Sequence, residues 1–190
     1  MATDLFTSHP IPKGGTYTLT TYFGALLFEA EAEYGPRLRE WTPIGIEFFD
    51  CRQPHIWFPG NRKQVCIRLT SSSMTDPAEA HWQLCQEIVH VLAPVEKATN
   101  LEEGMATHFA VSVQKTIDVS AKAIAIQSSP YAAPLDDYVA LLSVDPQIIT
   151  KLRGLRQYFS HITADDILCA APSCDRALAA RLATVFSGHA

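Results

Sequence analysis

The sequence has 190 residues and a formal net charge of −5; 47% of its residues are hydrophobic and 18% are charged. This composition is typical of a globular protein with a sizeable core and excludes a largely disordered chain. The acidic balance, without a basic run, argues against nucleic acid or an anionic membrane surface as the main partner.

The amino-terminal segment lacks the features of a targeting signal. Residues 1–15 contain no apolar stretch of signal-peptide length. No segment approaches the ~18 uninterrupted apolar residues of a membrane-spanning helix. The five cysteines are an odd and scattered set, and we expect most of them to be reduced and buried. We therefore expect a cytoplasmic protein with no membrane partner, in which residues 1–15 form a flexible arm.

The first half of the chain predicts one helix followed by short strands. Residues 19–34 contain good helix formers and end at a Gly-Pro pair, which is a helix-stop signal. The β-branched and aromatic run at 43–50 predicts a strand. A Pro-Gly-Asn turn at 59–61 predicts a hairpin whose second strand is 65–70. We expect this second strand to lie at the edge of a small, mostly antiparallel sheet.

Two longer helices are predicted next. Asp76 is a good N-cap and Pro77 is favoured at the first helical position, so a helix is expected over 77–92. A second helix is expected over 101–116, with Asn100 as its cap.

The rest of the chain predicts shorter helices, at about 131–143, 146–160, 163–170 and 173–187. The order of elements predicts an α+β fold in which a small sheet packs on the two longer helices. Residues 16–190 are expected to form a single domain, with its core at 43–116 and a helical region at 120–190.

The helix over 77–92 carries polar residues on one side. Gln83, Gln86, Glu87 and His90 recur at i, i+3, i+4 and i+7. The simplest interpretation is an amphipathic helix with this stripe in water. A functional interpretation is also open, because side chains one turn apart can point at one ion. The frame Q-E-x-x-H differs by one residue from the H-E-x-x-H helix of zinc peptidases.

The start of the next helix has acidic residues that a structural role can explain. Asn100 and Glu103 can form a capping box, and Glu102 is favourable near a helix N-terminus. The same residues belong to the segment NLEEGMA, which contains the frame E-G-x-A.

An E-x-x-H helix followed by an E-G-x-A helix resembles the gluzincin branch of the zincin-like metallopeptidases. The resemblance covers residues 43–116. It implies a general base at Glu87, a second zinc ligand at His90 and a third at Glu103. Gln86 stands where the first histidine ligand of the family is found. The resemblance also implies that a peptide or protein pairs with the edge strand that we expect at 65–70.

The residue at position 86 determines how much zinc binding and peptidase activity we expect. An amide oxygen is a poor zinc ligand beside imidazole, so zinc binding is expected to be weak or absent. Weak or no peptidase activity follows. Three other readings stay open: a non-enzymatic interaction protein that uses the cleft, an active hydrolase with a substitute metal ligand, and a helical protein unrelated to zincins.

Helix geometry argues against most substitutes for the missing ligand. At 100° per residue, His81, Cys85 and His108 all point away from the proposed site. His55 lies in the predicted hairpin and stays open. A peptidase would also need a donor for the developing oxyanion, and the sequence does not distinguish among the candidates Tyr131, Tyr158 and His161.

Overall fold

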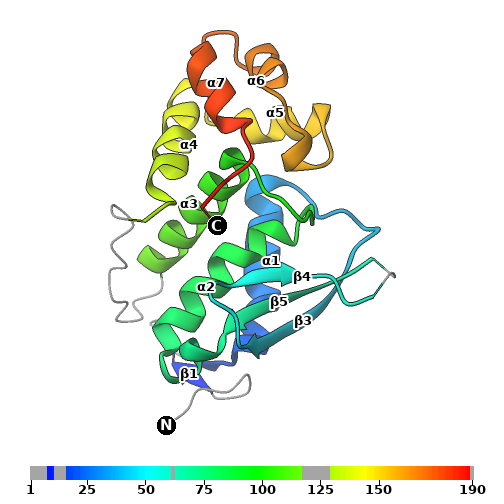
Figure 1. The fold of residues 1–190 in the computed structure, drawn as a ribbon, viewed down its shortest axis with the longest axis vertical. Coiled ribbons are helices and arrows are strands. Elements are labelled where there is room, and N and C mark those ends of the chain that lie inside the picture. The colour runs from blue at the N-terminus through cyan, green and yellow to red at the C-terminus, as the bar shows by residue number, and fades with distance from the viewer. Residues whose placement is uncertain (1–7, 11–15, 61–62, 117–128, 189–190) are drawn as a thin grey trace.

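The computed structural model describes residues 8–10, 16–60, 63–116 and 129–188, and its arrangement is shown in Figure 1. The fold is α+β, as predicted: helices pack against a small sheet, and further helices make up the C-terminal region. The expectation for a flexible arm falls mainly on residues 1–7 and 11–15, which lie outside the described residues. Part of the arm is ordered, because β1 (His9–Pro10) pairs with β2 (Thr16–Tyr17), which follows the arm, in an antiparallel ladder.

The main sheet has three strands in the order β3-β5-β4. They are β3 (Thr42–Phe49), β4 (His55–Trp57) and β5 (Gln64–Thr70). β4 and β5 are antiparallel, which confirms the predicted hairpin partners. β3 and β5 are parallel over a longer stretch, so the sheet is mixed and the prediction of a mostly antiparallel sheet is wrong in this respect.

The prediction that 65–70 is an edge strand is also wrong, because β5 lies between the other two strands. The physical reason is visible in its burial. Val65, Cys66, Ile67 and Leu69 are all buried, so side chains on both faces of this strand are covered. A near-continuous apolar run of this kind is typical of a central strand. The edge strand beside the long helices is β4.

The first helix, α1 (Leu19–Tyr34), has the predicted bounds. Thr18 caps its N-terminus and forms a reciprocal capping box with Thr21. The chain leaves the helix at Gly35, whose φ of 90° is a conformation that favours glycine. α1 packs against the helix that carries the polar stripe and contacts β3.

Both central helices form where the sequence predicts them. α2 (Pro77–His90) begins at Asp76, whose carboxylate accepts hydrogen bonds from the N–H groups of Ala78 and Glu79. α3 (Asn100–Thr116) packs along α2. Asn100 is the first residue of α3, and its side-chain amide donates to the carbonyl of Arg181 at 2.9 Å, because the C-terminal helix lies over this helix end.

The C-terminal region consists of short helices, as predicted, with somewhat shorter bounds. They are α4 (Ala132–Val144), α5 (Ile148–Leu155), α6 (Ala164–Ala170) and α7 (Arg176–Leu182). Single turns of 3-10 helix lie at Ser71–Thr75 and Phe159–His161. α4 packs closely along α3, and the buried apolar residues of both halves form one cluster. Residues 120–128 of the predicted helical region lie outside the described residues.

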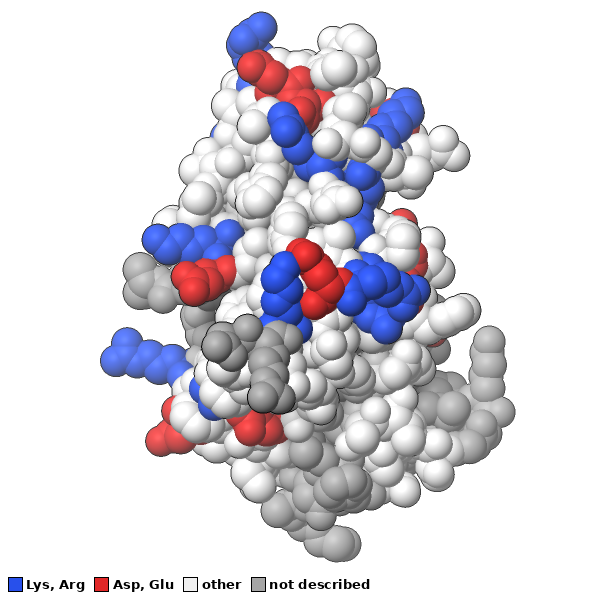
Figure 2. All heavy atoms as spheres, turned by 90° about the vertical axis from the view of Figure 1, so that its right-hand side faces the viewer, with Lys and Arg blue, Asp and Glu red and all other residues white. Residues whose placement is uncertain are grey.

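The surface in Figure 2 carries Lys and Arg mixed with Asp and Glu. Ion pairs such as Lys63–Glu40 at 2.6 Å and Arg156–Asp166 at 3.0 Å belong to this kind of surface. No described helix is both long and apolar enough to cross a bilayer.

Candidate functional site

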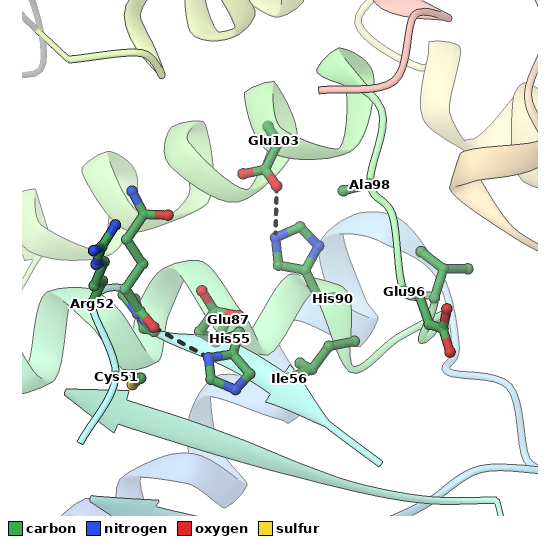
Figure 3. A pocket seen from close by; sticks show the side chains of 12 residues that line it. Cys51, Arg52, His55, Ile56, Glu87, His90, Glu96, Ala98 and Glu103 are labelled. Carbon is green, nitrogen blue, oxygen red and sulfur yellow. Dashed lines mark hydrogen bonds and ion pairs between the residues drawn. The ribbon is translucent and has the colours of Figure 1, made fainter. Parts of the chain in front are cut away.

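A hollow of ≈ 450 Å³ lies between the sheet edge and the two central helices (Figure 3). Residues 51–56, which lead into β4, form one wall. Glu87 and His90 reach it from α2, and Glu103 reaches it from α3. The hollow therefore collects the three residues that the gluzincin resemblance singles out.

The polar stripe of α2 is buried and does not face water. Gln83, Gln86, Glu87 and His90 are only 4%, 7%, 7% and 7% exposed. The interpretation of an amphipathic helix with a solvated stripe is therefore wrong. α3 packs along this helix and residues 51–56 face it across the hollow, so the stripe forms part of an internal polar site.

His90 is held between two carboxylates of α3. Its Nδ1–H donates to Oε1 of Glu102 at 2.8 Å, and its Nε2 lies 3.7 Å from Oε1 of Glu103. The predicted approach of His90 and Glu103 is thus found. The bond at Nδ1 fixes the ring so that Nε2 faces Glu103 and the hollow (Figure 3).

The carboxylates decide the charge of His90. Burial by itself would lower the pKa of its imidazole. The negative charges of Glu103 and Glu87, with the hydrogen bond to Glu102, outweigh burial and raise the pKa to about 10. At neutral pH and without a metal, His90 is therefore an imidazolium.

Glu102 is a site residue that the sequence does not reveal. Its side chain is fully buried, and burial raises its pKa although His90 opposes that shift. Its Oε1 accepts the bond from His90, while its buried Oε2 has no hydrogen-bond partner among the described residues. In the sequence Glu102 looks like an acidic residue that stabilises a helix N-terminus. That explanation is sufficient by itself, so nothing in the sequence indicates the contact with His90, twelve residues earlier.

Gln86 does not join the other three residues in the hollow. Its amide donates to Oγ1 of Thr107 at 3.4 Å. It lines a second hollow of ≈ 270 Å³, which shares Arg52, Gln53 and Pro54 with the first. The two hollows therefore adjoin at residues 52–54, and we call them together the groove; Gln86 lines the second hollow.

The donor atoms fit zinc only in part. Two donors bound to one tetrahedral zinc at about 2.0–2.2 Å lie roughly 3.3–3.6 Å apart. The 3.7 Å between His90 Nε2 and Glu103 Oε1 is close to that value. Yet no group of three or more His, Cys, Asp or Glu side chains in the described part of the chain could hold a metal ion. Gln86 offers a neutral amide that is committed to Thr107. His90 and Glu103 are thus placed for one ion, whereas Gln86 does not lie beside them as a third ligand.

His81, Cys85 and His108 lie away from the hollow, as helix geometry predicts, whereas His55 lines it. His81 stacks on Tyr22 with ring centroids 4.4 Å apart, and Cys85 lies beside it at 3.9 Å, in the core on the other side of α2. His108 faces Glu33 of α1. His55 does line the hollow, and its Nδ1 donates to the carbonyl of Gln53 at 3.1 Å.

Of the three candidate oxyanion donors, Tyr131 is the one that lies at the groove. It lines the second hollow, directly before α4. Burial raises its pKa, and the charges of Glu103 and Glu87 add to that effect, so its hydroxyl stays protonated at neutral pH. Tyr158 accepts a bond from Trp41 and donates to Glu40, and His161 packs beside it, in another part of the molecule.

No protein-family model, no curated protein and no solved structure matches this chain. The resemblance to gluzincins thus rests on the motif residues and their arrangement alone.

Proposed function

We propose that this protein is a gluzincin-like relative of the metallopeptidases in which Gln86 replaces the first zinc ligand. We infer weak or no peptidase activity, and a retained groove that binds peptide. The observation that carries the proposal is His90, whose Nδ1–H bonds to buried Glu102 at 2.8 Å while Nε2 turns to Glu103 and the hollow. A zinc-ligating histidine characteristically gives its second N–H to a carboxylate in this way.

His90 is surrounded by three buried carboxylates, which is more than an ordinary buried ion pair contains and supports a functional site. Glu102, Glu103 and Glu87 are 0%, 3% and 7% exposed, and they surround one imidazolium. Three carboxylates gathered around one imidazole favour a cation beside them, which supports the proposed relation to a metal site.

The loss of one ligand explains why activity is expected to be low. Glu87 lines the hollow beside His90, where it can accept a proton from water, and Tyr131 supplies a hydroxyl donor nearby. A three-ligand zinc site depends on every ligand, so two strong donors bind zinc weakly. The residues for proton transfer are therefore retained while the metal site is incomplete.

Peptide binding is expected along β4, which replaces 65–70 as the strand at the groove. β4 (His55–Trp57) is an edge of the sheet, and His55 and Ile56 line the hollow. Extended peptides bind by adding a strand to such an edge. A protein that only binds partners would use the same groove.

A second candidate function is an active hydrolase with a substitute ligand, and His55 favours it. Its Nδ1–H is bonded to a backbone carbonyl, so Nε2 is the ring nitrogen that a metal ion in the hollow would use. A movement of the segment 51–56 toward α2 would then complete the ligand set.

The test is the zinc affinity of the wild type against Gln86→His, measured by competition with a chromophoric chelator. The new imidazole stands one turn before His90 and needs little more room than the amide. We expect Gln86→His to bind zinc more than tenfold tighter, that is by more than about 1.4 kcal/mol. Zinc affinity is the readout, because it depends on the ligands alone, whereas proteolysis also depends on substrate binding and on the oxyanion donor.

Two further variants make the zinc measurement specific. Gln147→His adds the same imidazole at an exposed position in the helical region and should leave the affinity unchanged. His55→Ala distinguishes the two candidate functions, because only the substitute-ligand hydrolase loses zinc with His55. Equal affinities of wild type and Gln86→His would contradict the degenerate-site proposal.

A further inference from the structure

Arg52 stands where the two hollows of the groove meet. It lines both, together with its neighbours Gln53 and Pro54, on the segment between β3 and β4. Among the described residues that line either hollow, it is the one Lys or Arg. It is exposed and forms no ion pair with any described residue.

The other charged groups of the groove are mainly acidic. The carboxylates are Glu79, Glu87, Glu96 and Glu103. Figure 3 shows Arg52 at one end of the larger hollow and Glu96 at the opposite end. The larger hollow therefore has a cation at one end and an anion at the other, and Arg52 is the end at which a negatively charged group of a ligand would bind.

The chemistry of the guanidinium identifies the ligand group that Arg52 fits. An arginine side chain is always charged, and its planar fork of donors matches a carboxylate with two parallel hydrogen bonds. The imidazolium of His90 cannot play this part, because Glu102 and Glu103 already hold it. Arg52 is thus the free cation of the groove among the described residues.

We infer that Arg52 is a specificity residue that binds a carboxylate of the peptide in the groove. The carboxylate is either the C-terminus of the peptide or an Asp or Glu side chain, which share the same chemistry. The inference rests on the proposed function only in that it takes this groove as the peptide site. It makes no use of zinc.

The experiment compares three blocked tripeptides by NMR titration of the full-length protein, following the Arg52 Nε–Hε resonance and the dissociation constant. They are N-acetyl-trialanine with a free carboxyl terminus, the same peptide as its amide, and N-acetyl-alanyl-aspartyl-alanine amide. We expect at least one carboxylate peptide to bind tenfold or more tighter than the neutral amide. The peptide that does so identifies the source of the carboxylate.

Variants then assign the preference to Arg52. In Arg52→Gln the carboxylate peptides and the amide should bind equally. Arg52→Lys keeps the charge but loses the fork, and should keep only part of the preference. Arg39→Gln removes an exposed arginine that lines neither hollow and should change nothing.

Three results would overturn the inference: equal binding of all three peptides by the wild type, a preference that survives in Arg52→Gln, or no binding of any of them at millimolar concentration. These results are independent of the zinc measurement. A protein whose zinc affinity is unchanged by Gln86→His can still show the carboxylate preference. Conversely, Gln86→His can bind zinc more tightly in a protein that shows no carboxylate preference.

Discussion

His90 gives the site its acid–base behaviour, because its imidazole lies inside the protein among carboxylates. The structure raises its pKa to about 10 from the ordinary value of 6.5, mainly through Glu103 and Glu102 acting against burial. The folded protein therefore holds this proton more tightly than the unfolded chain. The stability gained is fully present below about pH 6.5 and is lost as the pH rises toward 10.

We therefore expect the free energy of unfolding of the metal-free protein to fall between pH 6.5 and pH 10. Urea denaturation in the presence of a chelator measures it at each pH. His90→Gln keeps a polar side chain of similar size that does not titrate, so its stability should depend less on pH over this range. Equal slopes for the two proteins would show that His90 is not protonated in the folded state.

The carboxylate of Glu102 helps to keep His90 protonated. Glu102→Gln removes the charge that bonds to His90 Nδ1, so the pKa of His90 should fall, as followed by its imidazole NMR resonances. Breaking one partner of a buried pair costs about 3–5 kcal/mol, and we expect a loss of stability of that order at neutral pH. An unchanged His90 pKa would rule out the pairing.

At the scale of elements, the glycine of the E-G-x-A frame lets two helices approach. A Cβ at Gly104 would lie 2.7 Å from the Cβ of Tyr138 and closer still to the carbonyl oxygen of Pro134. Both neighbours belong to α4, which packs along α3. Tyr131 directly precedes α4, so this close approach also places Tyr131 at the groove.

Gly104→Ala should therefore destabilise the protein by about 1–3 kcal/mol, because the backbone of α4 has to move to make room for the methyl group. The matched control is Gly24→Ala in α1, where nothing lies within 4 Å of the added Cβ. Alanine is the better helix former, so Gly24→Ala should stabilise the protein by up to about 1 kcal/mol. Chemical denaturation measures both changes. A stabilised Gly104→Ala would mean that α3 and α4 are not in close contact.

The molecule has one core that is shared by its sheet half, residues 16–116, and its helical half, residues 129–188. Buried residues from Tyr17 to Leu182 form one cluster, in which Met105 and Phe109 of α3 and Tyr138 and Leu141 of α4 take part. The hydrogen bond from Trp41 to Tyr158, at 3.1 Å, also joins the two halves. A continuous core of this kind unfolds cooperatively.

We expect a single unfolding transition. The three tryptophans, Trp41, Trp57 and Trp82, all lie in the sheet half, whereas far-ultraviolet circular dichroism also detects the C-terminal helices. The fluorescence and dichroism curves in urea should therefore coincide. Separate midpoints would show that the helical region is a unit of its own.

Several parts of this fold follow from the sequence by itself. The bounds of α1 and the start of α2 are local features, since caps, prolines and glycines act within a few residues. The spacing of Glu87 and His90 on one side of α2 is fixed by the helical repeat alone. The approach of His90 to Glu103 also followed from the sequence, through the resemblance to gluzincins.

The tertiary structure alone decided the rest, because it depends on which segments pack together. The central place of β5 depends on β3 pairing with it in parallel, and no local pattern specifies a parallel partner. The polar stripe of α2 became an internal site because α3 and residues 51–56 lie over it. Glu102 gained its bond to His90, and Arg52 its place between the two hollows, for the same reason: long-range packing brought distant residues together.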